Sequence, residues 1–228
     1  MSRRRKALVL ALVPALLLTA YTASQALAAK VTAGKYVATV SGASTSPNVF
    51  KIGTGVREIS CTATAIGGSL SAASETVSVS GEATQCTSNG LAIPVTGTTN
   101  GCTITATFTG ISGTTGTANT AVDCPAEEEL EVRLYQNATT HAEGITICEY
   151  GIPAQGSLKT LETHNSGSGS SEDILATASV GEIKVNGLKG TLILCGVAAG
   201  KTTTATYTGS LTATATEEAG AQVGLMVG

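Results

Sequence analysis

The sequence has few of the side chains on which most binding and catalytic proteins depend. It has no Trp, two Phe and five Tyr, so aromatic residues make up 3% of the chain, and charged residues make up only 13%. No stripe of Lys and Arg is present, which excludes a nucleic-acid partner because such proteins need cations to neutralise phosphates. The chain also lacks charged heptads and a Gly period, which excludes coiled coils and collagen. Its hydrophobic fraction of 42% is too high for a disordered tail.

The first 28 residues have the features of an export signal. Arg3–Lys6 form a basic start, an apolar run extends from Ala7 to about Leu18, and Ala26-Leu27-Ala28 fits a small-x-small cleavage site. The apolar run is well short of the roughly 20 residues that span a bilayer, so a membrane anchor is the less favoured alternative. Removing this segment leaves nine basic and 16 acidic residues, a formal net charge of −7. We expect a secreted, extracellular protein without a membrane span in its mature chain, and an association with the cell wall stays open.

All six cysteines lie beyond the predicted signal. In an exported chain an even number of cysteines favours disulfides, here three. There is no Cys-x-x-Cys pair and no Cys within four residues of a His, which argues against a zinc site. The residues predicted to form disulfides are Cys61, Cys86, Cys102, Cys124, Cys148 and Cys195.

Turn signals favour one of the possible pairings. The midpoints of 61–86, 102–124 and 148–195 each fall in or beside a segment rich in Gly or Ser. Residues equidistant from a hairpin turn lie opposite each other, where two Cβ atoms can approach to bonding distance. We therefore favour the sequential pairing. The alternative pair Cys124–Cys148 also straddles a turn signal, at Gln136-Asn137, and stays open.

Most of the mature chain alternates apolar residues with small polar ones. Tyr36–Val40, Thr76–Ser80 and Cys102–Phe108 show this period of two clearly. Such alternation is typical of strands with one buried face and one solvated face. Asn-Gly pairs, such as Asn100-Gly101 and Asn186-Gly187, are strong hairpin signals.

These patterns predict an all-β fold with no helix of ten residues or more in the mature chain. We expect a disulfide-stabilised immunoglobulin-like β-sandwich over residues 29–228, with about eleven strands. It forms either one extended sandwich or two tandem lobes, with a possible seam near residues 124–128, where Cys124-Pro125 ends a strand. Residues 162–171, rich in Ser and Gly, are predicted to form a loop.

Several short motifs carry a resemblance to a known group of proteins. They are the strand Tyr36–Val40, Cys61-Thr-Ala-Thr, the stretch Asn100–Phe108, Val122–Pro125 and Tyr207–Thr212. Together they resemble exported, cysteine-containing, β-rich proteins of soil actinobacteria that have no assigned activity. The resemblance implies export and an all-β fold, and it implies no functional residues.

Candidate catalytic and metal-binding residues are few. His141 and His164 each follow a Thr in a predicted loop, and His164 with Asp173 and a loop serine is the best arrangement for a hydrolase. Acidic residues also gather in one stretch, where carboxylates could hold Ca²⁺ or hydrolyse a glycoside. The absence of Trp platforms and of EF-hand spacing favours a solvated strand edge instead. This acidic stretch comprises Asp123, Glu127, Glu128, Glu129 and Glu131.

The favoured interpretation is an exported, non-enzymatic protein with a structural or binding role at the cell envelope or in the extracellular space. Its partner is then a cell-envelope component or another protein, and no cofactor, metal or catalytic residue is expected. Binding would use loops, and 137–143 and 162–173 have the most varied side chains. The alternatives are a carrier of a small apolar ligand and, less favoured, an extracellular hydrolase.

Overall fold

The computed structural model describes residues 29–34, 36–53, 55, 57–89, 95–136 and 145–228. The predicted export signal and His141 lie outside these residues. In chain order the elements are β1 (Val31–Ala33), β2 (Ala38–Ser44), β3 (Asn48–Ile52), β4 (Arg57–Leu70), β5 (Thr76–Ser88), β6 (Val95–Thr98), β7 (Thr103–Ser112), β8 (Thr115–Asp123), β9 (Glu129–Tyr135), β10 (Thr146–Pro153), β11 (Gln155–Ser166), the 3₁₀ turn η1 (Gly169–Ser171), β12 (Asp173–Lys189), α1 (Leu192–Cys195), β13 (Thr202–Glu217), β14 (Gln222–Val223) and β15 (Leu225–Val227).

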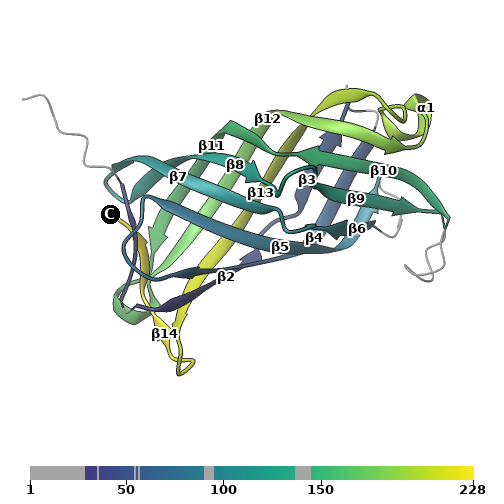
Figure 1. Ribbon diagram of the computed structural model, residues 1–228. Coiled ribbons are helices and arrows are strands. Elements are labelled where there is room, and N and C mark those ends of the chain that lie inside the picture. Colours follow the sequence, from purple (N-terminus) through teal and green to yellow (C-terminus); the bar gives the residue numbers. More distant parts are fainter. Residues whose placement is uncertain (1–28, 35, 54, 56, 90–94, 137–144) are drawn as a thin grey trace, which may run out of the picture.

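The main sheet closes on itself (Figure 1). Starting from β13, neighbouring strands follow the order β2, β4, β5, β7, β8, β11 and β12, and β12 then pairs with β13 again. The pairings around this ring are antiparallel. Strands β12 and β13, with 17 and 16 residues, extend from one end of the ring to the other. Closure leaves the ring strands without a free edge along their paired length.

At two positions around the ring, two shorter strands share the length of one long neighbouring strand. The first part of β13 pairs with β3 and its second part with β2, and β4 divides its pairing between the same two strands. On the other side, β12 pairs with β11 near Asp173 and with β10 near Lys189. Strands β9 and β6 then extend the sheet beyond β10. The ring is therefore continuous, although the strands that pair with β12, β13 and β4 differ between its two ends.

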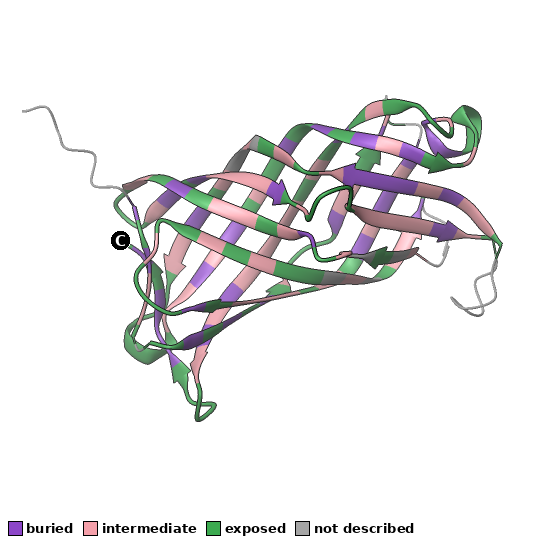
Figure 2. Cartoon of the chain, viewed as in Figure 1, coloured by how far each residue is buried: buried purple, intermediate pink, exposed green. Residues whose placement is uncertain are grey.

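The alternation in the sequence sets which side chains face inward (Figure 2). Along β12, Ile174, Val180 and Val185 are buried while the residues between them are mostly exposed or half-buried. Outward positions carry small hydroxyl side chains that pair across strands, such as Ser41 with Thr214 at 3.2 Å. This is the expected result of a period of two on a sheet with one dry face.

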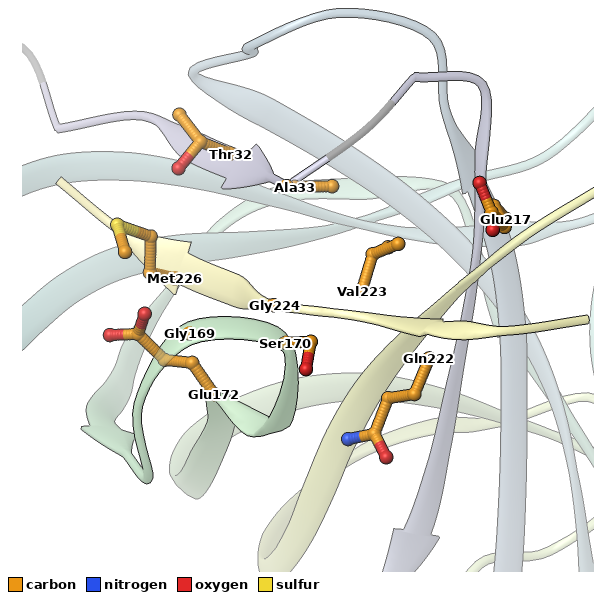
Figure 3. A pocket seen from close by; sticks show the side chains of 11 residues that line it. Thr32, Ala33, Gly169, Ser170, Glu172, Glu217, Gln222, Val223, Gly224 and Met226 are labelled. Atoms are coloured by element: carbon orange, nitrogen blue, oxygen red, sulfur yellow. The ribbon is translucent and has the colours of Figure 1, made fainter.

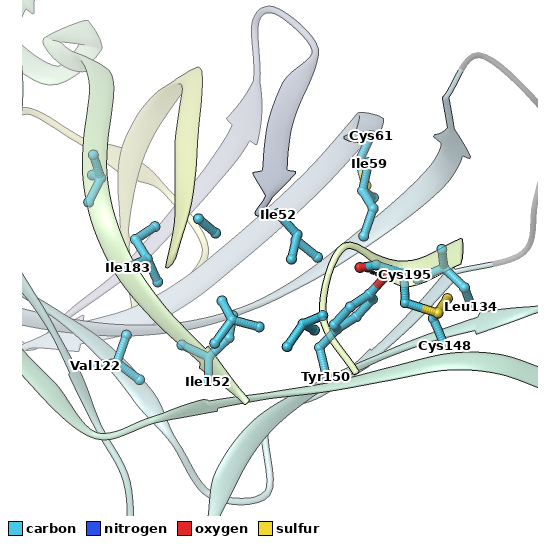
Figure 4. Packing of buried hydrophobic residues seen from close by; sticks show 14 of the residues in the cluster. Ile52, Ile59, Cys61, Val122, Leu134, Cys148, Tyr150, Ile152, Ile183 and Cys195 are labelled. Carbon is cyan, nitrogen blue, oxygen red and sulfur yellow. Dashed lines mark hydrogen bonds between the residues drawn. A yellow bond between two sulfur atoms is a disulfide. The ribbon is translucent and has the colours of Figure 1, made fainter. Parts of the chain in front are cut away.

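The interior holds two separate apolar clusters. One lies toward α1 and includes Ile52, Leu134 and Tyr150 (Figure 4). The other lies toward β15 and includes Leu70, Phe108 and Leu225. We call the two ends of the closed sheet the α1 end and the β15 end. The helices in the described part are too short to cross a bilayer.

Three disulfides join the cysteines in the predicted sequential order, and no cysteine is free: Cys61–Cys86, Cys102–Cys124 and Cys148–Cys195. The hairpin argument explains two of them. Cys61 and Cys86 face each other across β4 and β5, and the second bridge closes the base of the β7–β8 hairpin. For Cys148–Cys195 the pairing is confirmed but the reason differs, since Cys195 lies on the short helix α1, which contacts β10, and not on a strand that pairs with β10.

The all-β, disulfide-stabilised fold is confirmed. The immunoglobulin-like arrangement is not confirmed, because such sandwiches divide their strands between two packed sheets, whereas 13 strands of the described residues form one sheet. The pairing also crosses the possible seam near residues 124–128, since β8 before it pairs with β11 after it. The predicted loop 162–171 is wrong in its first half, because β11 continues to Ser166.

Candidate functional site

A ribbon formed by β1 and β15 closes the β15 end of the sheet. Val31 pairs with Val227 and Ala33 with Leu225 in antiparallel register. The side chain of Asn165 on β11 holds this ribbon from the inside. Its Nδ2 donates to the carbonyl of Val227 at 2.8 Å, and its Oδ1 accepts from the Val227 N–H at 2.9 Å. The amide of Asn165 thus makes the two hydrogen bonds that a neighbouring strand would supply.

A pocket of about 530 Å³ opens beside this ribbon (Figure 3). Residues from β1, η1, the end of β13, β14 and β15 surround it, so segments far apart in the sequence contribute to one hollow. Its lining residues are Thr32, Ala33, Gly34, Gly169, Ser170, Glu172, Glu217, Gln222, Val223, Gly224 and Met226.

Main-chain hydrogen bonds fix the walls of the pocket. The carbonyl of Glu172 accepts from the Leu225 N–H at 2.8 Å, and the carbonyl of Gly224 accepts from the Gly34 N–H at 2.7 Å. Gly224 also passes so close to η1 that a Cβ on it would collide with the carbonyl of Gly169. Because a side chain cannot be added there without moving the turn, we expect this wall to depend on glycine at position 224.

The chemical character of the pocket comes from a small number of polar groups. The carboxylates of Glu172 and Glu217 lie at different sides of the hollow, and Thr32 and Ser170 supply hydroxyls (Figure 3). Gln222 donates from its amide to Asp173 at 3.1 Å. Such a lining can accept hydrogen bonds from a hydroxyl, amine or ammonium group. Among the described residues, no three His, Cys, Asp or Glu side chains lie close enough together to hold a metal ion.

The predicted acidic stretch is distributed over other interactions. Glu131 and Glu149 both bind Arg133, at 2.6 and 2.9 Å, and the hydrogen bond with Glu149 is the main cause that raises the pKa of Arg133. Glu129 accepts from the amide of Asn186 at 2.6 Å. Asp123 accepts from the hydroxyl of Thr105. Asp123 ends β8, and Glu129 and Glu131 lie on β9, but both strands are paired on each side, so the predicted strand edge is wrong for these three residues. Glu127 and Glu128 are exposed in the turn before β9.

The candidate hydrolase residues lie on the paired strands β11 and β12, where Ser166 is opposite Asp173 and His164 is opposite Leu175, but His164 and Asp173 have different hydrogen-bond partners. His164 lies on β11, so its predicted loop position is wrong, and its Nδ1 is 3.0 Å from the hydroxyl of Thr115. Asp173 lies at the start of β12 with its carboxylate near Gln222. The segment 162–173, predicted as a binding loop, contributes Gly169, Ser170 and Glu172 from its second half to the pocket described above.

Arg57 is a buried polar residue that no motif in the sequence indicates. Arg57 is only 9% exposed and reaches into the cluster at the α1 end. Its Nη1 donates to the hydroxyl of Ser88 at 3.0 Å, and Nη2 donates to the carbonyl of Leu194. Its Nε is buried and has no hydrogen-bond partner among the described residues. A signal was present, since alternation on β4 places residue 57 on the same face as Ile59 and Cys61.

Tyr150 lies beside this arginine. Its hydroxyl donates to the carbonyl of Cys195 at 2.9 Å (Figure 4). Burial raises the pKa of Tyr150 to about 12, although the nearby Arg57 cation partly opposes the shift. Together, Arg57 and Tyr150 satisfy the main-chain carbonyls at the end of α1, and this indicates a structural role for both.

Comparison with known proteins adds no relative, since no family model, curated protein or solved structure matches the chain.

Proposed function

We propose that the protein is an exported, non-enzymatic binding protein of the cell envelope or extracellular space, and that the pocket at the β15 end holds its ligand. The observation that carries the proposal is the pocket itself, whose volume of about 530 Å³ lies within the range of about 300–1,000 Å³ typical of small-molecule sites. Its walls are fixed by main-chain hydrogen bonds, which favours a preformed site.

The lining favours a small polar ligand that carries an amine or several hydroxyl groups. Glu172 supplies a carboxylate, and aromatic side chains are absent from the described residues that line the pocket. A carboxylate that loses water on binding needs a hydrogen-bond donor or a cation in return. This chemistry makes a carrier of purely apolar molecules the weaker alternative.

A binding role also agrees better with the remaining residues than a hydrolase does. His164 and Asp173 have separate partners, and Glu131 and Glu149 share Arg133. Export is supported by the three disulfides, because such bonds persist mainly in oxidising compartments.

Native mass spectrometry tests the proposal. The protein is recovered from its producing cells by gentle fractionation, and we expect a small ligand bound to the wild type and at least about tenfold less in a Glu172→Gln variant. Glu128→Gln is the matched control, because it makes the same charge change on an exposed turn outside the pocket. Equal ligand content in the two variants, or none in the wild type, would overturn the proposal.

A further inference from the structure

Four large apolar side chains are exposed together at the α1 end. Their exposed fractions are 43% for Leu188, 61% for Leu192, 85% for Ile193 and 54% for Leu194. We call residues 188–201, which are the last two residues of β12 and the segment that joins it to β13, the α1 tip. Single apolar side chains on a surface need no explanation, but a contiguous group on one projecting turn marks an interaction site.

The α1 tip is held in place by specific bonds. The hydroxyl of Thr191 accepts from the Leu194 N–H at 3.4 Å, and Gly196 ends the turn in the left-handed region with φ of 74°. The next residue inward, Cys195, is tied to Cys148 by a disulfide, and its carbonyl accepts from Tyr150. The apolar side chains are therefore exposed on an anchored turn, and little ordering is needed before they bind a partner.

The charged side chains of the tip itself are positive, and Glu149 on β10, which is opposite Lys189, is already bound to Arg133. Lys189 and Lys201 are exposed at its two sides, and no Asp or Glu occurs between Glu182 and Glu217. Neither lysine forms an ion pair within the part of the chain that the structure describes. The whole chain is acidic, with a formal net charge of −3, so this cationic and apolar surface contrasts with the rest of the molecule.

We infer that the α1 tip docks on the surface of an anionic lipid bilayer. Leu192, Ile193 and Leu194 would enter the boundary between headgroups and acyl chains, while Lys189 and Lys201 meet lipid phosphates. Apolar insertion combined with nearby cations is the usual basis of peripheral membrane binding. Figure 1 shows α1 at the extremity of the molecule away from β14, so the tip can reach a surface without the pocket end approaching it.

A second copy of the chain is the weaker occupant for two reasons. Four side chains on one turn cannot bury the about 800 Å² per partner that a specific protein interface requires. Tip-to-tip association would also bring the two lysine pairs together, and like charges at close range disfavour each other. A bilayer needs no shape complementarity and supplies the opposite charge.

The absence of Trp allows a direct test with a single fluorophore. An Ile193→Trp variant of the exported protein is mixed with vesicles of phosphatidylglycerol and phosphatidylcholine in equal parts, and with vesicles of phosphatidylcholine alone. We expect a blue-shifted emission with the anionic vesicles only. Tyr36→Trp places the fluorophore on an exposed position just before β2, outside the pocket lining, and its emission should not shift.

Co-sedimentation with the same vesicles gives the second measurement. Changing Leu192, Ile193 and Leu194 to Ser, or Lys189 and Lys201 to Glu, should each weaken binding to anionic vesicles by about tenfold or more. Ile193→Ser alone is the substitute if the triple variant does not fold, because residue 193 is the most exposed of the group. The inference is overturned if the wild type does not bind anionic vesicles, or if the variants bind them as well as the wild type does. It is also overturned if the tip substitutions abolish a dimer instead. None of these results bears on the pocket, which is tested by ligand content.

Discussion

The two ends of the closed sheet are stabilised in different ways. At the α1 end, all six cysteines lie in or against the apolar cluster, so three disulfides reinforce it. The cluster at the β15 end contains no cysteine and depends on the β1–β15 ribbon and on Asn165. One end is thus cross-linked by covalent bonds, while the other is closed by strand pairing, which can open and re-form.

The surfaces of the two ends also differ in charge and polarity. The α1 end carries exposed apolar side chains with Lys189 and Lys201, whereas the β15 end carries Glu172 and Glu217 around a pocket. A molecule built in this way can hold a surface with its rigid end while its other end exchanges a small ligand. We therefore expect four perturbations to destabilise the two ends to different extents.

Reduction of the disulfides should have the largest effect. On the chain-entropy model each bridge contributes about 3–4 kcal/mol, so losing all three approaches the whole stability of about 5–15 kcal/mol of a typical domain. Hydrogen exchange under reducing conditions should show β9 and β10 losing protection before β1 and β15, because all the bridges lie at the α1 end. Earlier loss at β1 and β15 would contradict the assignment of the covalent end.

Leu225→Ala should destabilise the β15 end by about 2–5 kcal/mol in urea unfolding, because it opens a cavity in a packed cluster. Leu225 is only 1% exposed, whereas its neighbour Met226 is 37% exposed. Met226→Ala is therefore the matched control and should change stability by less than about 1 kcal/mol. Equal effects of the two substitutions would mean that β15 does not enter the interior.

Alkaline pH should act on the α1 end through Tyr150. Its pKa is raised to about 12 in the folded protein, against about 10 in the unfolded chain. The native state therefore holds a proton that the unfolded state loses, and stability is complete below pH 10 and falls as the pH rises toward 12. The loss is about 2–3 kcal/mol.

Urea titrations at several pH values, with wild type and Tyr150→Phe compared, measure this loss. Phenylalanine cannot titrate, so the difference between the two proteins isolates residue 150 from Tyr207, whose pKa burial also raises. A pH dependence that is the same in both proteins would show that Tyr150 does not contribute.

Asn165→Ala should have the smallest of these effects, a loss of about 2 kcal/mol, because it leaves the N–H and carbonyl of Val227 without their side-chain partners. Hydrogen exchange should then rise at β15 and stay unchanged at α1. Asn165→Asp is the control, since it keeps an acceptor for the Val227 N–H and loses only the donor. If Asp destabilises as much as Ala, the donated bond to the carbonyl carries the effect.

The sequence allowed many strands and two of the three disulfides to be predicted from local rules, whereas Cys148–Cys195 joins a strand to the helix α1. Alternation of apolar and small polar residues marks β2, β5 and β7, and hairpin symmetry places Cys61 opposite Cys86. His164 was misplaced because the polar stretch around it resembles a loop, and its pairing with β8 and β12 overrides that local preference.

Closure and the pocket could not be predicted in this way. The ring depends on β13 lying beside β2, and Thr214 pairs with Ser41 across most of the chain, which no local pattern indicates. The pocket depends on five elements that meet only once the ring is closed. By contrast, Arg57 was predictable as an inward side chain from its place on β4, although its contacts with α1 were not.

The pairing of β13 with both β2 and β12 also determines when the ring can close during folding. Strands β4, β5, β7 and β8 can pair with their neighbours as soon as they have been synthesised, but the ring stays open until residues 202–217 follow. Until then the two edges of the open sheet have unpaired main-chain N–H and C=O groups, which can pair with another chain. The order of emergence therefore makes the last long strand the step that decides between a finished molecule and an aggregate, and folding slows accordingly because its contacts span so much sequence.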